Sequence, residues 1–184
     1  YYPVEKMCSY MTDVLLTINK EDFALAKSKM KAKRVLYVPG VGVDTEKFDS
    51  DQVHKSIKGE LGIPNGATMI LSIGELNENK NHESVIRALA EIGQTVSTNI
   101  YYVIVGKGIL EEKLKRTAAE SGLEGQIIFT GFRTDVIDFY HSADIFVFPS
   151  YREGLSVALM EAMASGLPIA ASHIRGNCDL IDLQ

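Results

Sequence analysis

The sequence has little cysteine and no long apolar run. Its two cysteines among 184 residues, Cys8 and Cys178, lie far apart and without a Cys-x-x-Cys pattern, so neither a disulfide framework nor a zinc site is expected. No apolar stretch is long enough to span a bilayer and no signal-peptide pattern opens the chain, so we expect a cytoplasmic protein. A net charge of -5 gives no reason to expect nucleic acid or an anionic membrane surface as a partner.

From residue 68 onwards, short apolar runs alternate with segments of helical periodicity. This alternation predicts an α/β fold with a parallel sheet and helices on both of its faces. We expect strands at residues 69–73, 100–105, 127–130, 145–148 and 168–171. We expect helices near residues 82–92, 110–121, 135–141 and 156–165. A smaller unit of strand, helix and strand is expected before them, at residues 14–18, 19–30 and 35–38, with Asn19 as the helix N-cap.

The clearest chemical signal is a strand, turn and helix near the end of the sequence. The apolar run at residues 145–148 leads through a polar turn to a helix with Ser156 as its expected N-cap. The first amides of a helix lack intrahelical partners and form an anion site. Glu153 in the turn and Glu161 in the helix flank this site, and carboxylates accept hydrogen bonds from hydroxyl groups. A nucleotide sugar offers both the phosphates and the hydroxyls.

For either glutamate alone, a loop residue or a solvated helix position would be the better interpretation. The whole run, however, resembles the signature of retaining glycosyltransferases of family 4, the "glycosyl transferases group 1" set. In these enzymes two glutamates are separated by seven residues, as Glu153 and Glu161 are, with a triplet like Gly154-Leu155-Ser156 after the first. The resemblance implies that Glu153 contacts the donor sugar, that the amides from Gly154 to Val157 bind the diphosphate, and that Glu161 binds the ribose hydroxyls.

Loops after the earlier strands carry further candidates, because ligands bind beyond the carboxyl ends of parallel strands. Family members often show Gly-Arg, a spacer and Lys after the first strand of this sheet. Gly74 and Lys80 match the Gly and the Lys, although Lys80 alone would be interpreted as a surface lysine. Glu75 stands where the family usually has Arg. Either Lys80 acts with the helix terminus alone, or Arg133 or Arg152 supplies the missing charge.

The next two loops contain Gly106-Lys107-Gly108 and Gly131-Phe132-Arg133. A lone Gly-x-Gly is weak evidence and is fully explained by a tight turn into a helix. By resemblance, Gly106 and Gly108 line the nucleotide cleft, while Phe132 and Arg133 approach the base. Phe132 is equally compatible with a place in the core.

The resemblance implies a GT-B enzyme built from two facing Rossmann-like domains. Residues 1–48 would be a remnant of the N-terminal acceptor domain and its linker, and residues 49–184 a C-terminally truncated nucleotide-sugar-binding domain. The Asp49-Ser50-Asp51 triplet formally matches a metal-binding Asp-x-Asp, but chance explains it better. By the resemblance, no metal and no cofactor are expected, and the catalytic candidates are Glu153 and Lys80.

The function implied by the resemblance is sugar transfer with retention from a nucleotide-diphosphate sugar, with a UDP-sugar favoured, to a saccharide or lipid-linked acceptor. Membrane association, at the inner face of the membrane, would come only from the N-terminal acceptor domain, of which residues 1–48 would be the remnant. We expect this polypeptide alone to bind donor without efficient transfer. Two alternatives remain open: a non-catalytic nucleotide-binding module, suggested by Glu75, and another GT-B enzyme such as a sugar-nucleotide epimerase or a phosphorylase.

Overall fold

The structure is a computed structural model that describes residues 2–48, 54–95 and 99–181. The chain forms two compact units. The first unit comprises the chain up to Val43, the loop Arg152–Val157 and the segment from His173 onwards. The second unit comprises Asp44–Tyr151 and Ala158–Ser172. The predicted Asp49-Ser50-Asp51 triplet and the predicted domain boundary after residue 48 involve residues outside those that the structure describes.

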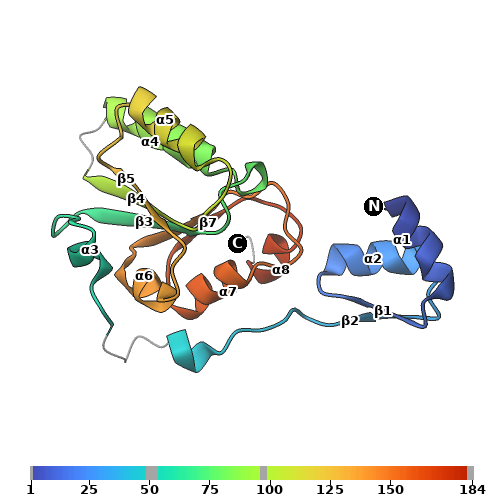
Figure 1. The fold of residues 1–184 in the computed structure, drawn as a ribbon. Coiled ribbons are helices and arrows are strands. Elements are labelled where there is room, and N and C mark those ends of the chain that lie inside the picture. Colours follow the sequence, from blue (N-terminus) through green and yellow to red (C-terminus); the bar gives the residue numbers. More distant parts are fainter. Residues whose placement is uncertain (1, 49–53, 96–98, 182–184) are drawn as a thin grey trace. The chain divides into compact units, whose positions relative to one another are not determined.

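The second unit contains a five-stranded parallel sheet in the order β5-β4-β3-β6-β7 (Figure 1). Its strands are β3 (Thr68–Ile73), β4 (Ile100–Val105), β5 (Ile127–Gly131), β6 (Ile145–Phe148) and β7 (Ile169–Ala171). Parallel strands that are buried on both faces need nearly continuous apolar sequence, as β4 and β6 have. The predicted parallel α/β sheet is therefore confirmed, with strand ends that differ from the prediction by one residue at β3, β5 and β7.

Helices cover both faces of this sheet. On one face α4 (His82–Thr95) and α5 (Glu111–Glu120) enclose a core with Ile70 of β3 and with Tyr102 and Ile104 of β4. On the other face lie α6 (Val136–Ser142), α7 (Val157–Ala164) and the short α3 (Ile57–Glu60) (Figure 1). There the ring of Tyr140 in α6 lies 5.7 Å from that of Phe146 in β6. Since successive side chains of a strand point to opposite faces, these two cores use alternate residues of the same strands.

The stretch before β3 is fixed to α6 rather than extended in solvent. Ile57 is fully buried, and its amide donates to Ser142 Oγ at 2.9 Å. The amide of Lys55 donates to Asp138 Oδ1 at 3.1 Å. The ring of Phe48, at the end of the 3-10 helix η2 (Thr45–Phe48), lies 5.9 Å from that of Tyr140. Residues 54–60 thus belong to the second unit.

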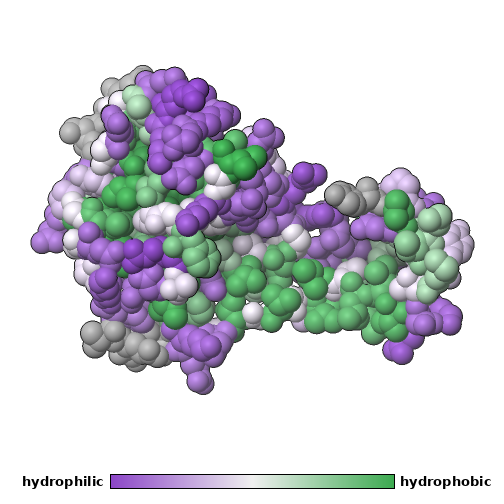
Figure 2. Space-filling model, in the orientation of Figure 1, coloured by the Kyte–Doolittle hydropathy of each residue, from purple (hydrophilic) through white to green (hydrophobic). Residues whose placement is uncertain are grey.

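The first unit contains α1 (Tyr2–Cys8), the 3-10 helix η1 (Ser9–Met11), β1 (Val14–Thr17), α2 (Lys20–Lys29), β2 (Arg34–Tyr37) and α8 (Asn177–Leu180). Strands β1 and β2 pair in parallel. Asn19 caps α2 as predicted, because its side chain accepts a hydrogen bond from the amide of Asp22 at 2.7 Å. Two strands of four residues cannot cover their own apolar side chains, and Leu16 remains 59% exposed. Figure 2 shows apolar surface on the part of the chain that Figure 1 labels β1 and β2. No helix among residues 2–48, 54–95 and 99–181 is long and apolar enough to cross a bilayer.

Candidate functional site

A pocket of about 540 Å³ opens at the carboxyl ends of β3, β4 and β5. Its lining comes from the ends of β3 and β4, from the loops that follow the three strands and from the start of α6: Ile73, Gly74, Glu75, Val105, Gly106, Lys107, Phe132, Arg133 and Val136. The predicted site residues Gly74, Gly106, Phe132 and Arg133 are therefore brought together. Phe132 is 70% exposed, so it is not a core residue. A mainly apolar pocket with a few polar side chains is the usual form of a small-molecule site.

Gly106 and Gly108 allow the first two of these loops to touch. Gly106 has a φ of 149°, and a side chain there would overlap the carbonyl oxygen of Gly74. A side chain at Gly108 would overlap the backbone of Leu76. The loops are joined by a hydrogen bond of 3.1 Å from the amide of Leu76 to the carbonyl of Lys107. Close loop packing therefore explains both glycines, and Gly106 in addition lines the pocket.

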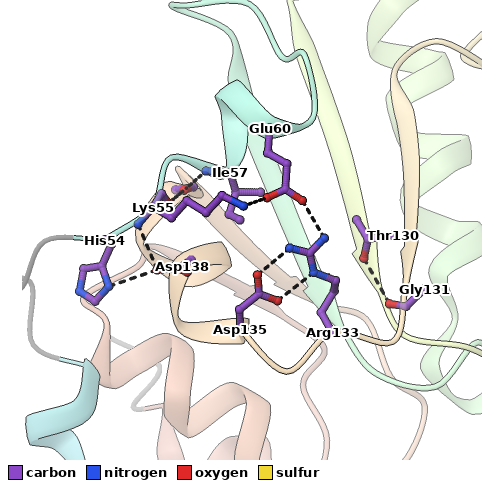
Figure 3. Close-up of polar contacts among 10 residues, drawn as sticks. His54, Lys55, Ile57, Glu60, Thr130, Gly131, Arg133, Asp135 and Asp138 are labelled. Carbon is purple, nitrogen blue, oxygen red and sulfur yellow. Dashed lines mark hydrogen bonds and ion pairs between the residues drawn. The ribbon is translucent and has the colours of Figure 1, made fainter.

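Arg133 lies in an ion-pair network (Figure 3). Its guanidinium donates to both carboxylate oxygens of Asp135, at 2.8 Å and 2.6 Å, and to Glu60 Oε1 at 2.7 Å. These bonds raise the pKa of Arg133 and lower the pKa of Asp135 and of Glu60, which also pairs with Lys55. Since the guanidinium fork is already bound to two carboxylates, the network weighs against Arg133 as the cation that replaces the Arg missing at position 75.

Lys80 is held by its surroundings. It ends the 3-10 helix η3 (Glu78–Lys80), where Asn77 Oδ1 accepts its amide at 3.1 Å. Its stem runs beside Gly74, where an added Cβ would lie 3.2 Å from Lys80 Cε. The ammonium lies 4.7 Å from the ring centroid of Phe148, within cation–π range. These contacts give Lys80 a defined place next to the pocket residue Gly74, which favours the site interpretation over that of a mobile surface lysine.

Glu161 is half-buried on α7 and has a defined partner. The hydroxyl of Tyr140 donates to Glu161 Oε2 at 2.9 Å and lies 3.1 Å from the carbonyl of Ala158. Burial, together with the charge of Glu161, raises the pKa of Tyr140, so its hydroxyl stays a donor. Glu161 is therefore not a freely solvated helix position. Tyr140 was missed in the sequence because it lies among the apolar residues of a predicted helix, and only its partner reveals a second role.

The Glu153 loop belongs to the first unit. Glu153, Gly154 and Leu155 are half-buried, Ser156 is 5% exposed, and α7 begins at Val157. The carbonyl of Gly154 accepts a hydrogen bond of 3.1 Å from Asn19 Nδ2. Gly176, with a φ of 82°, lies so close that a side chain there would overlap this carbonyl. Contacts from distant parts of the chain thus shape the predicted loop, and Ser156 stands at the position expected for an N-cap.

No group of three or more His, Cys, Asp or Glu side chains that could hold a metal ion occurs within the part of the chain that the structure describes. The four histidines of the chain lie in different environments. His82 is buried with a tyrosine partner, His173 is exposed, and His54 and His141 stack with ring centroids 3.7 Å apart.

A parallel sheet with helices on both faces and a pocket at its carboxyl edge defines the class of Rossmann-like nucleotide-binding domains. Within that class, the family model described as "Glycosyl transferases group 1" matches residues 53–183 of this chain. The chain therefore belongs to this family. The predicted membership of the glycosyl transferases group 1 set is thereby confirmed.

Relatives and solved structures agree with this assignment. The chain is 33% identical over 184 residues to EpsD of Bacillus subtilis, which carries the name of a glycosyltransferase, with 98% of the chain and 48% of the relative covered. It is 28% identical over 187 residues to the UDP-Gal:alpha-D-GlcNAc-diphosphoundecaprenol alpha-1,3-galactosyltransferase of Escherichia coli, with the same two shares covered. Anabaena HepE, solved with UDP and glucose, has a TM-score of 0.84 at 18% identity over 99% of this chain and 50% of its own, which shows a shared fold. The chain spans about half the length of the curated relatives it matches.

Proposed function

We propose that this chain supplies the donor-binding part of a glycosyltransferase. The reaction would move a sugar from a nucleoside-diphosphate sugar, with a UDP-sugar favoured, to a saccharide or lipid-linked acceptor with retention of configuration. The observation that carries this proposal is the pocket formed by Gly74, Gly106, Phe132 and Arg133. It is supported by family membership, by a relative named for UDP-galactose and a diphosphoundecaprenol acceptor, and by the fold shared with a protein solved with UDP and glucose.

Each site residue has a proposed role that follows from its chemistry. The nucleobase would occupy the pocket against Phe132, whose exposed ring offers an apolar face. Glu161, oriented by Tyr140, would accept hydrogen bonds from the ribose hydroxyls. The amides from Gly154 to Val157 at the start of α7 would bind the diphosphate, and Glu153 would contact the donor sugar.

The chemical contribution of these groups would be electrostatic. When the bond to the sugar breaks, negative charge develops on the leaving diphosphate. Lys80 and the amino end of α7 carry positive charge and partial positive charge, and fixed charges need little reorganisation during reaction. The restraint of Lys80 by Gly74 and Phe148 fits this role. We propose no resident metal or cofactor, because in the proposed roles the nucleotide sugar is the substrate and Lys80 and the amino end of α7 would supply the positive charge for its phosphates.

The proposal is tested by titrating the chain with UDP, GDP and ADP and following its thermal unfolding. A ligand that binds only the folded state adds about 2.7 kcal/mol of stability at a hundredfold excess over its Kd. We expect one nucleoside diphosphate to raise the unfolding temperature, and Glu161→Ala to remove most of that rise. Glu120→Ala, at an exposed position on α5, is the matched control and should behave like the wild type. If no nucleoside diphosphate stabilises the chain, the donor-site proposal fails.

We further propose that the chain alone transfers sugar poorly, since transfer requires both substrates to be held together. Efficient glycosylation by the purified chain would contradict this part. A second function, a nucleotide-binding module without transfer, is favoured by Glu75 in the pocket lining together with the bound state of Arg133. That alternative predicts a protein of the relatives' full length that binds nucleotide but transfers no sugar.

A further inference from the structure

Three ionisable side chains line the pocket, and they differ in the hydrogen bonds and ion pairs that they form. Arg133 is bound to Asp135 and Glu60. Glu75 is exposed and accepts one hydrogen bond of 3.0 Å from Asn77 Nδ2. Lys107 is also exposed, and among the described residues its ammonium group forms no hydrogen bond or ion pair. The pocket therefore presents one uncommitted donor and one carboxylate with spare acceptor capacity.

The backbone places these two groups on neighbouring loops. The loop after β3 carries Glu75, and the loop after β4 carries Lys107. A hydrogen bond from the amide of Leu76 to the carbonyl of Lys107 ties the loops together. The stem of Lys107 passes the end of β5, because an added Cβ on Gly131 would lie 3.5 Å from Lys107 Cε. Gly131 has a φ of 70°, so glycine suits both its backbone and the passage of the lysine.

We propose that Lys107 and Glu75 together select the nucleobase of the donor, and that they favour a base with a ring carbonyl next to an N–H group. This inference rests on the proposed function. An ammonium only donates hydrogen bonds and an ionised carboxylate only accepts them. Uracil and guanine present a carbonyl oxygen beside an N–H group, so each can meet Lys107 and Glu75 with matched partners. Cytosine and adenine present an amino group where these bases have the oxygen, and in the same pose this donor would face Lys107.

The proposal also gives a reason for the unusual residue at position 75. Comparison with the family pattern alone shows Glu75 only as the loss of a cation that would bind the diphosphate. In the pocket its carboxylate becomes an acceptor for the N–H group of the base, while Lys80 remains the cation for the phosphates. Polar contacts of this kind carry specificity because a mismatched analogue leaves desolvated groups unpaired.

The test compares two nucleotides that differ in the base edge alone. Dissociation constants for UDP and CDP are measured by calorimetry for the wild type, Lys107→Met and Glu75→Met. We expect the wild type to prefer UDP, and each variant to reduce the preference about tenfold or more, mainly through weaker UDP binding. Lys115→Met, on α5 and paired with Glu111, is the control and should keep the wild-type ratio. If guanine is the bound base, the same expectation applies to the ratio of GDP to ADP.

The ratio of the dissociation constants for UDP and CDP separates selection of the base from general attraction between charges. A lysine that only attracts phosphates would weaken UDP and CDP binding equally when it is replaced, and this outcome would overturn the inference. A wild-type preference for CDP or ADP would overturn it too. Absence of any nucleoside diphosphate binding by the wild type would instead refute the proposed function. Because both substituted side chains are exposed, folding should be retained, and circular dichroism of each variant verifies this.

Discussion

Protonation of the buried His82 is expected to destabilise the protein in mild acid. Its side chain is 3% exposed, and Nδ1 lies 3.0 Å from the hydroxyl of Tyr102. Tyr102 donates to Ser72 Oγ at 2.9 Å, and Ser72 donates to the carbonyl of Val147 at 2.5 Å. The hydroxyl proton of Tyr102 is donated to Ser72, and that of Ser72 is donated to Val147. The Tyr102 oxygen can therefore only accept a hydrogen bond from His82, so Nδ1 of His82 must carry the hydrogen. The chain of bonds links the start of α4 to β4, β3 and β6.

Burial lowers the pKa of His82 from its ordinary 6.5 to about 4, and the charge of Lys80 acts in the same direction. The folded state therefore keeps this imidazole neutral at a pH where the unfolded chain binds a proton. The free energy of unfolding must then fall as the pH drops from about 6.5 towards 4. With about 1.4 kcal/mol per pKa unit, the full loss is on the order of 3 kcal/mol, and about 2 kcal/mol of it occurs between pH 7 and pH 5.

Urea unfolding of the wild type and of His82→Gln at pH 7, 6 and 5 measures this effect. We expect the variant to be less stable at pH 7 but to lose much less stability on acidification. His173→Gln, at an exposed position, should keep the wild-type slope. The carboxylates with lowered pKa values, Glu60, Glu83 and Asp135, lose their contribution as the pH falls below their ordinary pKa values, so they act below this window. An imidazole of His82 that titrates near 6.5 by NMR would refute the reasoning.

Three further predictions concern Gly106 in a pocket loop, Gly93 in α4 and Tyr140 in α6. Gly106→Ala should destabilise the protein by about 2 kcal/mol or more in urea unfolding, because its φ is positive and its Cβ would overlap the carbonyl of Gly74. Gly93→Ala, in α4 with no atom near the added methyl, should instead stabilise by about 0.5–1 kcal/mol. Tyr140→Phe should cost about 1 kcal/mol of stability and weaken nucleoside diphosphate binding several-fold, because Glu161 loses its 2.9 Å hydrogen bond. Calorimetry measures the affinity, and an unchanged value would show that Tyr140 does not position Glu161.

The secondary structure of the second unit could be predicted because its signals are local. Strands β4 and β6 occupy the predicted residues, since a run of apolar and β-branched side chains has few other stable environments. Helix α4 extends beyond the predicted Ile92 to Thr95, so Gly93, which directly follows the apolar periodicity, lies within the helix and does not end it. Helix ends depend on such weak local signals and are the least certain part of a prediction.

Residues of the candidate site could be predicted only where they belong to a recognisable sequence motif. Glu153, Glu161 and Lys80 were identified by spacing and resemblance, and their individual roles remain predictions. The bound state of Arg133 was not predictable, because its partner Glu60 lies 73 positions away in the sequence. The same holds for Tyr140 and Glu161, which are 21 positions apart on different helices. Sequence spacing within one element reports neighbours on that element and nothing about other elements.

The sequence by itself determined the alternation of strands and helices, the turn glycines and the family, because these depend on periodicity and on residues close to one another in the chain. Tertiary structure decided which loops meet. The strand order β5-β4-β3-β6-β7 brings the loops after β3, β4 and β5 to one edge and so creates the pocket with Glu75 and Lys107 in its wall. Strand order follows from how helices and strands bury their apolar faces together, and that is a property of the whole packed chain.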